Sequence, residues 1–194
     1  QRDGRKSLCA DLLEWTDGDG TPRADLLERL PLWIAPLVRS SYWARESGEP
    51  LWDKAAEERF RRLLTIVAQF CRSDGRSALS NGYQRDVASL LNWASPLAGW
   101  KKDSPALRFL STVGRKGKTA RAATTAVKSP RPVAQSDWAR VACLRSDWST
   151  EADSLVVAHH GERPLIDLTA LGTPLLEGVW DIEISVDGQP VTFV

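Results

Sequence analysis

Methionine is absent from this sequence, and histidine occurs only twice, at His159 and His160. Because translation starts at methionine, its absence predicts that the chain is processed or cut from a longer protein. Two histidines leave little material for a histidine-based metal site. A nucleotide-binding loop, a kinase motif and a Ser-His-Asp order are also missing, which disfavours phosphoryl transfer and the common nucleophilic hydrolases. We therefore expect no cofactor and no bound metal.

Cysteine is scarce and long apolar runs are missing. The three cysteines, Cys9, Cys71 and Cys143, lie far apart and lack CxxC spacing. Their spacing and odd number indicate neither a disulfide framework nor a zinc site, so we expect buried free thiols. No stretch approaches the roughly 18 uncharged apolar residues that a membrane span needs. The sequence predicts no membrane span, and it assigns no compartment.

Acidic residues are missing from one long segment. The formal net charge of +1 argues against a dedicated nucleic-acid binder. Nevertheless, all charged side chains in residues 104–136 are basic. From Asp147 onward, all charged side chains except Arg163 are acidic. The interpretation that we favour assigns no function to this segment: it is a solvated basic linker that lies against an acidic domain. The alternative is a strip that attracts an anionic polymer.

The clearest helical pattern covers residues 53–72. Glu57 with Arg61, and Glu58 with Arg62, have the i,i+4 spacing of ion pairs on a solvent-exposed helix face. The apolar side chains recur with helical spacing on one face: Phe60, Leu63, Leu64, Val67, Phe70 and Cys71. An earlier helix is predicted to start at Thr21-Pro22. We expect the prolines at positions 31 and 36 to break or kink it.

A short string recurs within this helical half. Residues 33–37 read Trp-Ile-Ala-Pro-Leu, residues 93–97 read Trp-Ala-Ser-Pro-Leu, and a further tryptophan follows each, at Trp43 and Trp100. Two helical hairpins in tandem fit this spacing, as in architectures whose units bury their faces on one another. Chance similarity of a five-residue string is the alternative.

The sequence period changes from helical to alternating in the C-terminal half. Residues 140–145 and 154–159 are rich in β-forming side chains, and residues 180–187 alternate apolar with polar. Asp187-Gly188 is typical of a tight turn into residues 191–194. About five strands without closure leave exposed edges. We therefore expect the rest of a sandwich to lie beyond this chain.

Several strings resemble the heparinase II/III-like polysaccharide lyases. Residues 30–33 and 70–76 are similar to late helices of that family's α/α toroid, and residues 141–148 with Asp153-Ser154-Leu155 and Gly161 are similar to the opening strands of its β-sandwich. The resemblance implies an α+β fold in which N-terminal α-helical hairpins (a partial α/α toroid) precede a C-terminal antiparallel β-sheet (a partial β-sandwich). The implied domains are 1–114 (helical), 115–135 (basic linker) and 136–194 (antiparallel β, truncated).

The reaction implied by the resemblance is β-elimination on a uronic-acid-containing polysaccharide, by a secreted or periplasmic parent protein. A base removes the proton beside the carboxylate, an acid protonates the leaving oxygen, and the carboxylate charge must be stabilised. In the family this work falls to Tyr and His with Asn or Arg nearby. No family catalytic motif matches this chain residue by residue, so candidate sites follow from residue type.

The first candidates lie between two predicted helices. Asn81 could neutralise a carboxylate, Tyr83 could donate a proton as a catalytic group, and Arg85 could clamp an anion. The bland interpretation, a Ser-Asn-Gly turn with a packing tyrosine and a surface arginine, is the stronger one. His159 and His160 are the other catalytic candidates. They point to opposite faces if their strand is regular, and a pair of surface turn histidines is the favoured interpretation.

Nine tryptophans are a high number for this length, and tryptophan is a common platform for sugar rings. Trp138 and Trp148 are the substrate-binding candidates, although packing where linker meets sheet is the favoured role for both. Trp33, Trp52 and Trp93 lie on or beside apolar stripes and are expected in the core.

Three functions remain open. The first is a lyase fragment, with an acidic polysaccharide as its partner. The second is a non-catalytic module of the same architecture that binds or scaffolds such a polysaccharide. The third is a helical interaction module fused to a β-domain, unrelated to sugars. Neither nucleic acid nor a membrane is expected as a partner, and the oligomeric state is not predicted.

Overall fold

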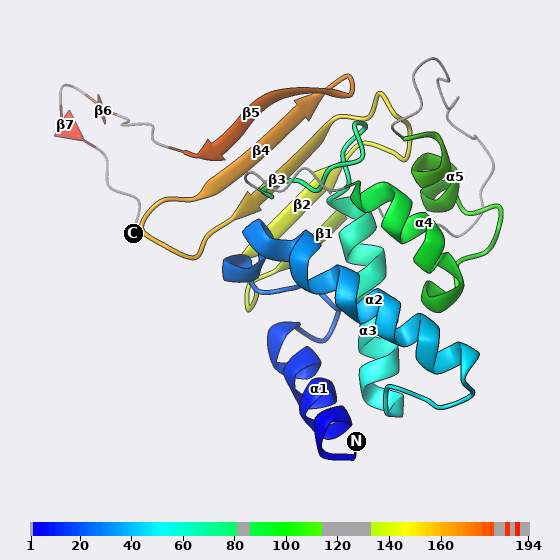
Figure 1. Ribbon diagram of the computed structural model, residues 1–194. Helices are drawn as coiled ribbons and strands as arrows, with labels where there is room; N and C mark the ends of the chain where they lie inside the picture. Colours follow the sequence, from blue (N-terminus) through cyan, green and yellow to red (C-terminus); the bar gives the residue numbers. More distant parts are fainter. Residues whose placement is uncertain (1, 81–85, 114–132, 181–184, 187–188, 191–194) are drawn as a thin grey trace.

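The computed structural model describes residues 2–80, 86–113, 133–180, 185–186 and 189–190. Helices occupy the described part ahead of residue 114, and an antiparallel sheet follows it, which confirms a mixed α+β fold (Figure 1). The helices are α1 (Arg2–Trp15), the 3₁₀ helix η1 (Ala24–Arg29), α2 (Leu30–Glu46), α3 (Lys54–Gln69), α4 (Val87–Ala98) and α5 (Pro105–Thr112). Within the described residues, no helix is both long and apolar enough to cross a bilayer.

Helix α3 confirms the strongest sequence pattern. The Asp53 carboxylate caps its N-terminus by accepting a hydrogen bond from the Ala56 N–H at 2.8 Å. Both expected ion pairs form on the exposed face, Arg61 with Glu57 and Arg62 with Glu58, each at 2.5 Å. All six apolar side chains predicted to share the opposite face are buried.

The helix expected after Thr21-Pro22 is divided differently. Thr21 is buried and does not cap a helix; Arg23 precedes η1, and α2 begins only at Leu30. The prolines at 31 and 36 were expected to break or kink this helix. The helix is divided beside Pro31, where η1 ends and α2 begins, but α2 continues through Pro36 without a break. Pro31 lies in the first turn, where its missing N–H has no helical partner to lose. Pro36 is exposed, so water can hydrogen-bond the carbonyl that it leaves free.

Both copies of the recurring string lie in helices, the first in α2 and the second in α4, and each contains a proline inside its helix. The two helices pack against each other, and α4 also packs on α3 and on α5. The second expected hairpin, α4 with α5, is therefore present. The first expected hairpin would pair α2 with α3. Instead, α2 packs mainly on α4, and a pocket of about 470 Å³ lies between the end of α2 and α3.

The five strands form an antiparallel meander in chain order: β1 (Val133–Ser136), β2 (Val141–Arg145), β3 (Ser154–Ala158), β4 (Leu165–Ala170) and β5 (Thr173–Val179). Strands β2 and β3 confirm two predictions from the sequence. Further along, β6 (Ser185–Val186) pairs with β7 (Gln189–Pro190). The rest of the strand expected from residue 180, the turn at 187–188 and residues 191–194 lie outside the described residues.

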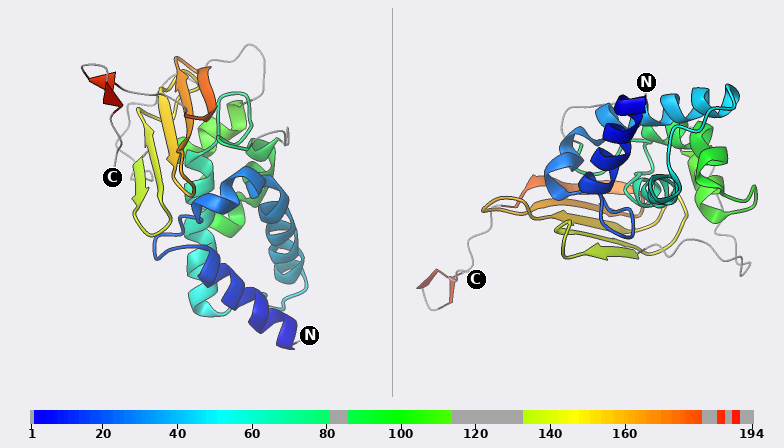
Figure 2. Two further views of the ribbon diagram at one scale, coloured as in Figure 1. Left: turned by 90° about the vertical axis from the view of Figure 1, so that its left-hand side faces the viewer. Right: turned by 90° about the horizontal axis from the view of Figure 1, so that it is seen from below.

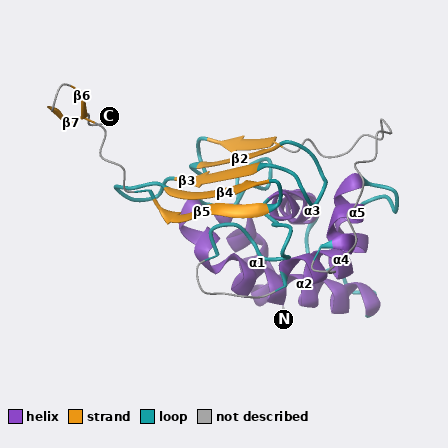
Figure 3. Ribbon diagram, turned by 90° about the horizontal axis from the view of Figure 1, so that it is seen from above, coloured by secondary structure: helices purple, strands orange, loops and turns teal. Residues whose placement is uncertain are grey.

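The helices cover one face of the sheet, which gives a two-layer arrangement (Figures 2 and 3). Burial alternates along β2, β3 and β4 because successive side chains point to opposite faces. The inward side chains Val141, Cys143, Val156, Ala158 and Leu165 belong to one continuous apolar core with the helices. Helices and sheet thus share a core; the domain boundaries given above stay a prediction.

Candidate functional site

A groove of about 410 Å³ opens where the turn between β1 and β2 meets the start of η1 and the end of β3. Two buried alanines, Ala24 and Ala139, form part of its lining. The other lining residues are large and polar or aromatic: Arg23, Asp25, Trp138, Arg140 and His160. The groove combines guanidinium groups, an imidazole and an indole, which are groups that recognise anions and flat ring faces.

Backbone hydrogen bonds hold the three segments of the groove together. The Ala24 N–H donates to the Ala139 carbonyl at 2.9 Å and fixes the start of η1 against the β1–β2 turn. The His159 N–H donates to the Arg140 carbonyl at 2.9 Å and fixes the end of β3 against the same turn. The Ser136 hydroxyl accepts from the Ala139 N–H at 3.0 Å. The lining side chains therefore project from a backbone that is fixed at several points.

Arg140 has an unusual backbone conformation, with φ of 55° in the left-handed region. A residue with a Cβ adopts this region at a cost of order 1 kcal/mol, so its presence in a tight turn indicates that neighbouring contacts impose it. The side chain is exposed, and among the described residues its guanidinium meets no hydrogen-bond or ion-pair partner. Arg140 therefore offers an unshared fork of donors to an anion.

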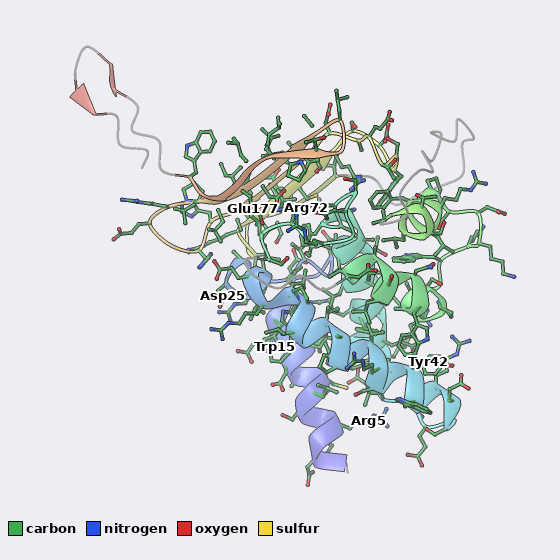
Figure 4. The ribbon with its side chains drawn as sticks, turned by 45° about the horizontal axis from the view of Figure 1, so that its top comes forward. Arg5, Trp15, Asp25, Tyr42, Arg72 and Glu177 are labelled. Atoms are coloured by element: carbon green, nitrogen blue, oxygen red, sulfur yellow. The ribbon has the colours of Figure 1, made fainter. Side chains whose placement is uncertain are left out.

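Arg23 and Asp25 form a bidentate pair at the edge of the groove, with N···O distances of 3.0 and 2.7 Å. Asp25 lies in the first turn of η1, ahead of α2 (Figure 4). Both side chains are 42% exposed, so the pair contributes little to stability and competes weakly with an incoming anion. The pair is neutral overall, which leaves Arg140 as the uncompensated charge of the groove.

Trp138 is 55% exposed at the groove, which is unusual for so large an apolar ring. The expectation that Trp138 packs at the start of the sheet is therefore wrong, whereas Trp148 does pack. Trp148 follows the opposite end of β2, 6.1 Å from the Phe109 ring, and is not part of the groove. The expectation of a core position is also wrong for Trp93, which is 42% exposed, but holds for Trp52.

The structure brings together two of the candidates named from residue type, Trp138 and His160. His159 is exposed but does not line the groove, as expected for consecutive residues at a strand end. Asn81, Tyr83 and Arg85 lie outside the described residues, so their proposed roles stay predictions. Most of the basic segment at 104–136 lies outside them too.

Three lining residues were missed from the sequence: Arg23, Asp25 and Arg140. Arg23 and Asp25 reach the groove only because η1 packs against the sheet more than a hundred residues later in the chain. The proximity of Arg140 to Trp138 was the one available local signal. A basic residue two positions from a candidate stacking ring is common in unrelated turns, so the signal was weak.

A second polar cluster lies between the layers, with two buried members, Arg72 and Asp167, and one exposed member, Glu177. Arg72, which follows α3, forms ion pairs with Asp167 on β4 and with Glu177 on β5, and the Arg72 and Glu177 side chains lie together in Figure 4. Asp167 also accepts a hydrogen bond from the Leu79 N–H at 3.2 Å. Burial alone would lower the pKa of Arg72, but its bonds to both carboxylates raise it. Burial raises the pKa of Asp167, and the bonds from Arg72 counter only part of this effect.

Arg145, on β2, forms a second buried contact between the sheet and the segment after α3. Its guanidinium donates to the carbonyls of Cys71, Asp147 and Ser149 at 2.8, 2.7 and 3.1 Å, and it stacks 4.1 Å from the centre of the Phe109 ring. Like Arg72, Arg145 is almost fully buried. Arg145 donates to protein carbonyls from all three guanidinium nitrogens, whereas Arg72 binds its two carboxylates through its terminal nitrogens and its buried Nε has no partner among the described residues. We interpret both arginines as structural links between helices and sheet.

Within the described part of the chain, no cluster of three or more His, Cys, Asp or Glu side chains has the geometry of a metal site. Comparison of the chain with protein-family models, with curated proteins and with solved structures finds no match in any of the three. The groove is therefore interpreted from its own residues.

Proposed function

We propose that the chain binds an acidic polysaccharide in the groove between η1 and the β1–β2 turn, as a glycan-binding module. The observation that carries the proposal is an exposed indole, Trp138, beside the guanidinium of Arg140, which has no partner among the described residues, on a fixed backbone. A pyranose ring has an apolar face of C–H groups that can stack on the indole. Its carboxylate or sulfate group can then accept charge-assisted hydrogen bonds from Arg140.

Size and charge support the same ligand class. The groove volume of about 410 Å³ lies within the range of small-molecule sites, which is about 300–1,000 Å³. Its open shape suits one part of a polymer that continues in both directions. Because the contacts are exposed and partly ionic, we expect modest affinity that falls with salt.

A second candidate function is favoured by one residue. His160 lies in the same groove as Arg23 and Arg140, so an imidazole stands near groups that could stabilise a carboxylate during β-elimination. A lyase fragment of the heparinase II/III-like kind is thus the alternative proposal. It would use His160 as base and requires a proton donor, for which Tyr83 remains the sequence-based candidate.

The finer architecture is part of the proposal. We infer that the helical layer belongs to an α/α toroid and the sheet to a β-sandwich. Support comes from the matching prolines inside α2 and α4, which pack on each other, and from the side of the sheet that faces away from the helices, where Leu144, Leu155 and Leu168 lie next to one another in register.

The test measures binding of defined oligosaccharides from heparin and alginate by isothermal titration calorimetry, with a neutral glucan of equal length as the comparison ligand. We expect binding of the acidic ligands only. Trp138→Ala should weaken it at least tenfold, whereas Trp43→Ala, which removes an indole that is 70% exposed far from the groove, should not. Equal loss in both variants, or binding of the neutral glucan with the same affinity, would reject the groove as the site.

The same samples distinguish binding from catalysis. β-Elimination creates an unsaturated uronic acid that absorbs in the ultraviolet, so absorbance is followed after mixing. Binding without a rise in absorbance supports the non-catalytic module. A rise that disappears in His160→Gln supports the lyase. The absence of affinity for any acidic glycan would favour an interaction module unrelated to sugars.

A further inference from the structure

The pocket of about 470 Å³ between the end of α2 and α3 shares no lining residue with the groove of the proposed function. Its volume falls within the range of small-molecule sites, about 300–1,000 Å³. Three of its lining side chains, Ser41, Trp52 and Phe60, are almost fully buried and form its deepest part. The two rings lie 5.1 Å apart, and the Trp52 indole N–H donates to the Ser41 hydroxyl at 2.8 Å. The floor of the pocket is therefore aromatic, with its polar atoms already paired.

Hydrogen bonds hold the loop that forms one wall of this pocket. The Gly48 N–H donates to the Arg45 carbonyl at 3.1 Å, and Gly48 has a φ of 73°, the left-handed conformation in which glycine commonly ends a helix. Arg5 of α1 donates to the carbonyls of Leu51 and Trp52, each at 3.0 Å. The loop is thus fixed both to the end of α2 and to α1. The pocket is therefore formed before a ligand enters, which lowers the cost of binding.

Charged side chains of both signs surround the mouth of the pocket. Four exposed residues of this kind line it: Arg45, Glu49, Glu57 and Arg61. Arg61 and Glu57 form an ion pair at 2.5 Å and neutralise each other. In the described part of the chain, the side chains of Arg45 and Glu49 have neither an ion-pair nor a hydrogen-bond partner. One guanidinium and one carboxylate therefore remain for a ligand.

We propose that this pocket binds a small zwitterion with an apolar side chain, either a free amino acid or a short peptide. A ligand that is only anionic meets the like charge of Glu49, and one that is only cationic meets the like charge of Arg45. A zwitterion matches both, because its carboxylate accepts hydrogen bonds from Arg45 and its ammonium group donates to Glu49. Its apolar side chain then covers the rings of Trp52 and Phe60.

The exposure of the charged groups sets the expected strength of binding. Ion pairs at an exposed mouth are screened by water and contribute little each, so most of the affinity must come from the apolar side chain on the floor. A ligand of amino-acid size has few atoms with which to make such contacts. We therefore expect a dissociation constant on the order of 1 mM for a single amino acid.

The test is isothermal titration calorimetry of the whole chain with L-phenylalanine and with the dipeptide phenylalanyl-leucine. The comparison ligands are 3-phenylpropionate and phenethylamine, which keep the ring and only one of the two charges. We expect the zwitterions to bind about fivefold more tightly than either comparison ligand. Tighter binding of the dipeptide assigns the pocket to peptides, and tighter binding of phenylalanine assigns it to free amino acids. Absence of binding by both zwitterions up to about 20 mM, well above the expected dissociation constant, overturns the proposal. Equal affinity for a comparison ligand overturns it too.

Variants of the two free charges locate the site. Arg45→Gln should weaken binding of L-phenylalanine about fivefold without weakening phenethylamine, and Glu49→Gln should do so without weakening 3-phenylpropionate. Arg39→Gln and Glu46→Gln are the matched controls, because both residues are exposed on α2 and neither lines the pocket. Near-ultraviolet circular dichroism checks that each variant is folded. Unchanged affinity in both pocket variants, or an equal loss in the controls, overturns the proposal because the ligand must then bind elsewhere.

Discussion

Arg72 and Asp167 lie 95 residues apart in the chain and form an ion pair in which both side chains are almost completely buried, at 2% and 1% exposure. The pair connects the segment after α3 to the central region of the sheet. Glu177 approaches the same guanidinium from the exposed edge strand at 2.9 Å. The main polar link between the layers is therefore one cation shared by two carboxylates.

Removing the cation should be strongly destabilising. In Arg72→Met the carboxylate of Asp167 stays buried without its partner, so we expect the free energy of unfolding to fall by about 3–5 kcal/mol. Urea denaturation measures the change. Adding Asp167→Asn to Arg72→Met should restore part of the loss, because the uncompensated charge disappears. A loss in the double variant equal to the sum of the losses in Arg72→Met and Asp167→Asn alone would show that the two side chains do not interact.

Arg145 should not be replaceable by lysine. The guanidinium donates to three carbonyls and stacks on Phe109, and a lysine ammonium cannot keep this planar arrangement. We expect Arg145→Lys to lower the free energy of unfolding by about 2–4 kcal/mol. The exposed Arg39→Lys, on α2, is the control and should change stability by less than about 0.5 kcal/mol. A result within that range for Arg145→Lys would contradict the structural role.

Arg140→Gly should separate charge from backbone conformation. Glycine adopts positive φ without strain, so we expect stability to be unchanged or raised by up to about 1 kcal/mol. Binding of acidic oligosaccharide should nevertheless weaken, since the groove loses its unpaired cation. Thermal denaturation and calorimetric titration measure the two effects. Unaltered affinity would remove Arg140 from the proposed site.

The buried thiols should make stability sensitive to alkaline pH. Burial raises the pKa of Cys71 and of Cys143 to about 12, from a usual value near 9. Above pH 9 the unfolded chain loses these protons before the folded chain does. The free energy of unfolding therefore falls as pH rises from about 9 toward 12.

Comparison with the Cys71→Ala, Cys143→Ala double variant isolates this contribution from other titrating groups. Its stability should decline less steeply over the same pH range in urea denaturation series. We also expect both thiols to resist a thiol reagent at pH 8 until the protein is unfolded. Rapid modification in the folded state would show that they are accessible as thiolates.

Local sequence patterns correctly predicted the elements whose side-chain spacing fits only one type of secondary structure. Residues 53–72 carry the spacing of ion pairs and one apolar stripe, and α3 follows them closely. The same holds for β2 and β3. The sequence did not show that α2 continues through Pro36, because the cost of an internal proline depends on whether its freed carbonyl is exposed, and the sequence does not say which side of the helix faces water.

The sequence by itself determined the α+β order, the helical character of both proline-containing strings and the burial of the three cysteines, since each follows from composition or from short-range periodicity. Only the tertiary structure decided which side chains meet. It placed Arg23, Trp138, Arg140 and His160 around one groove, buried Arg72 against Asp167, and lined up Leu144, Leu155 and Leu168 on neighbouring strands. Those arrangements depend on how the helical layer docks on the sheet and on strand register, which are set by contacts between residues far apart in the chain.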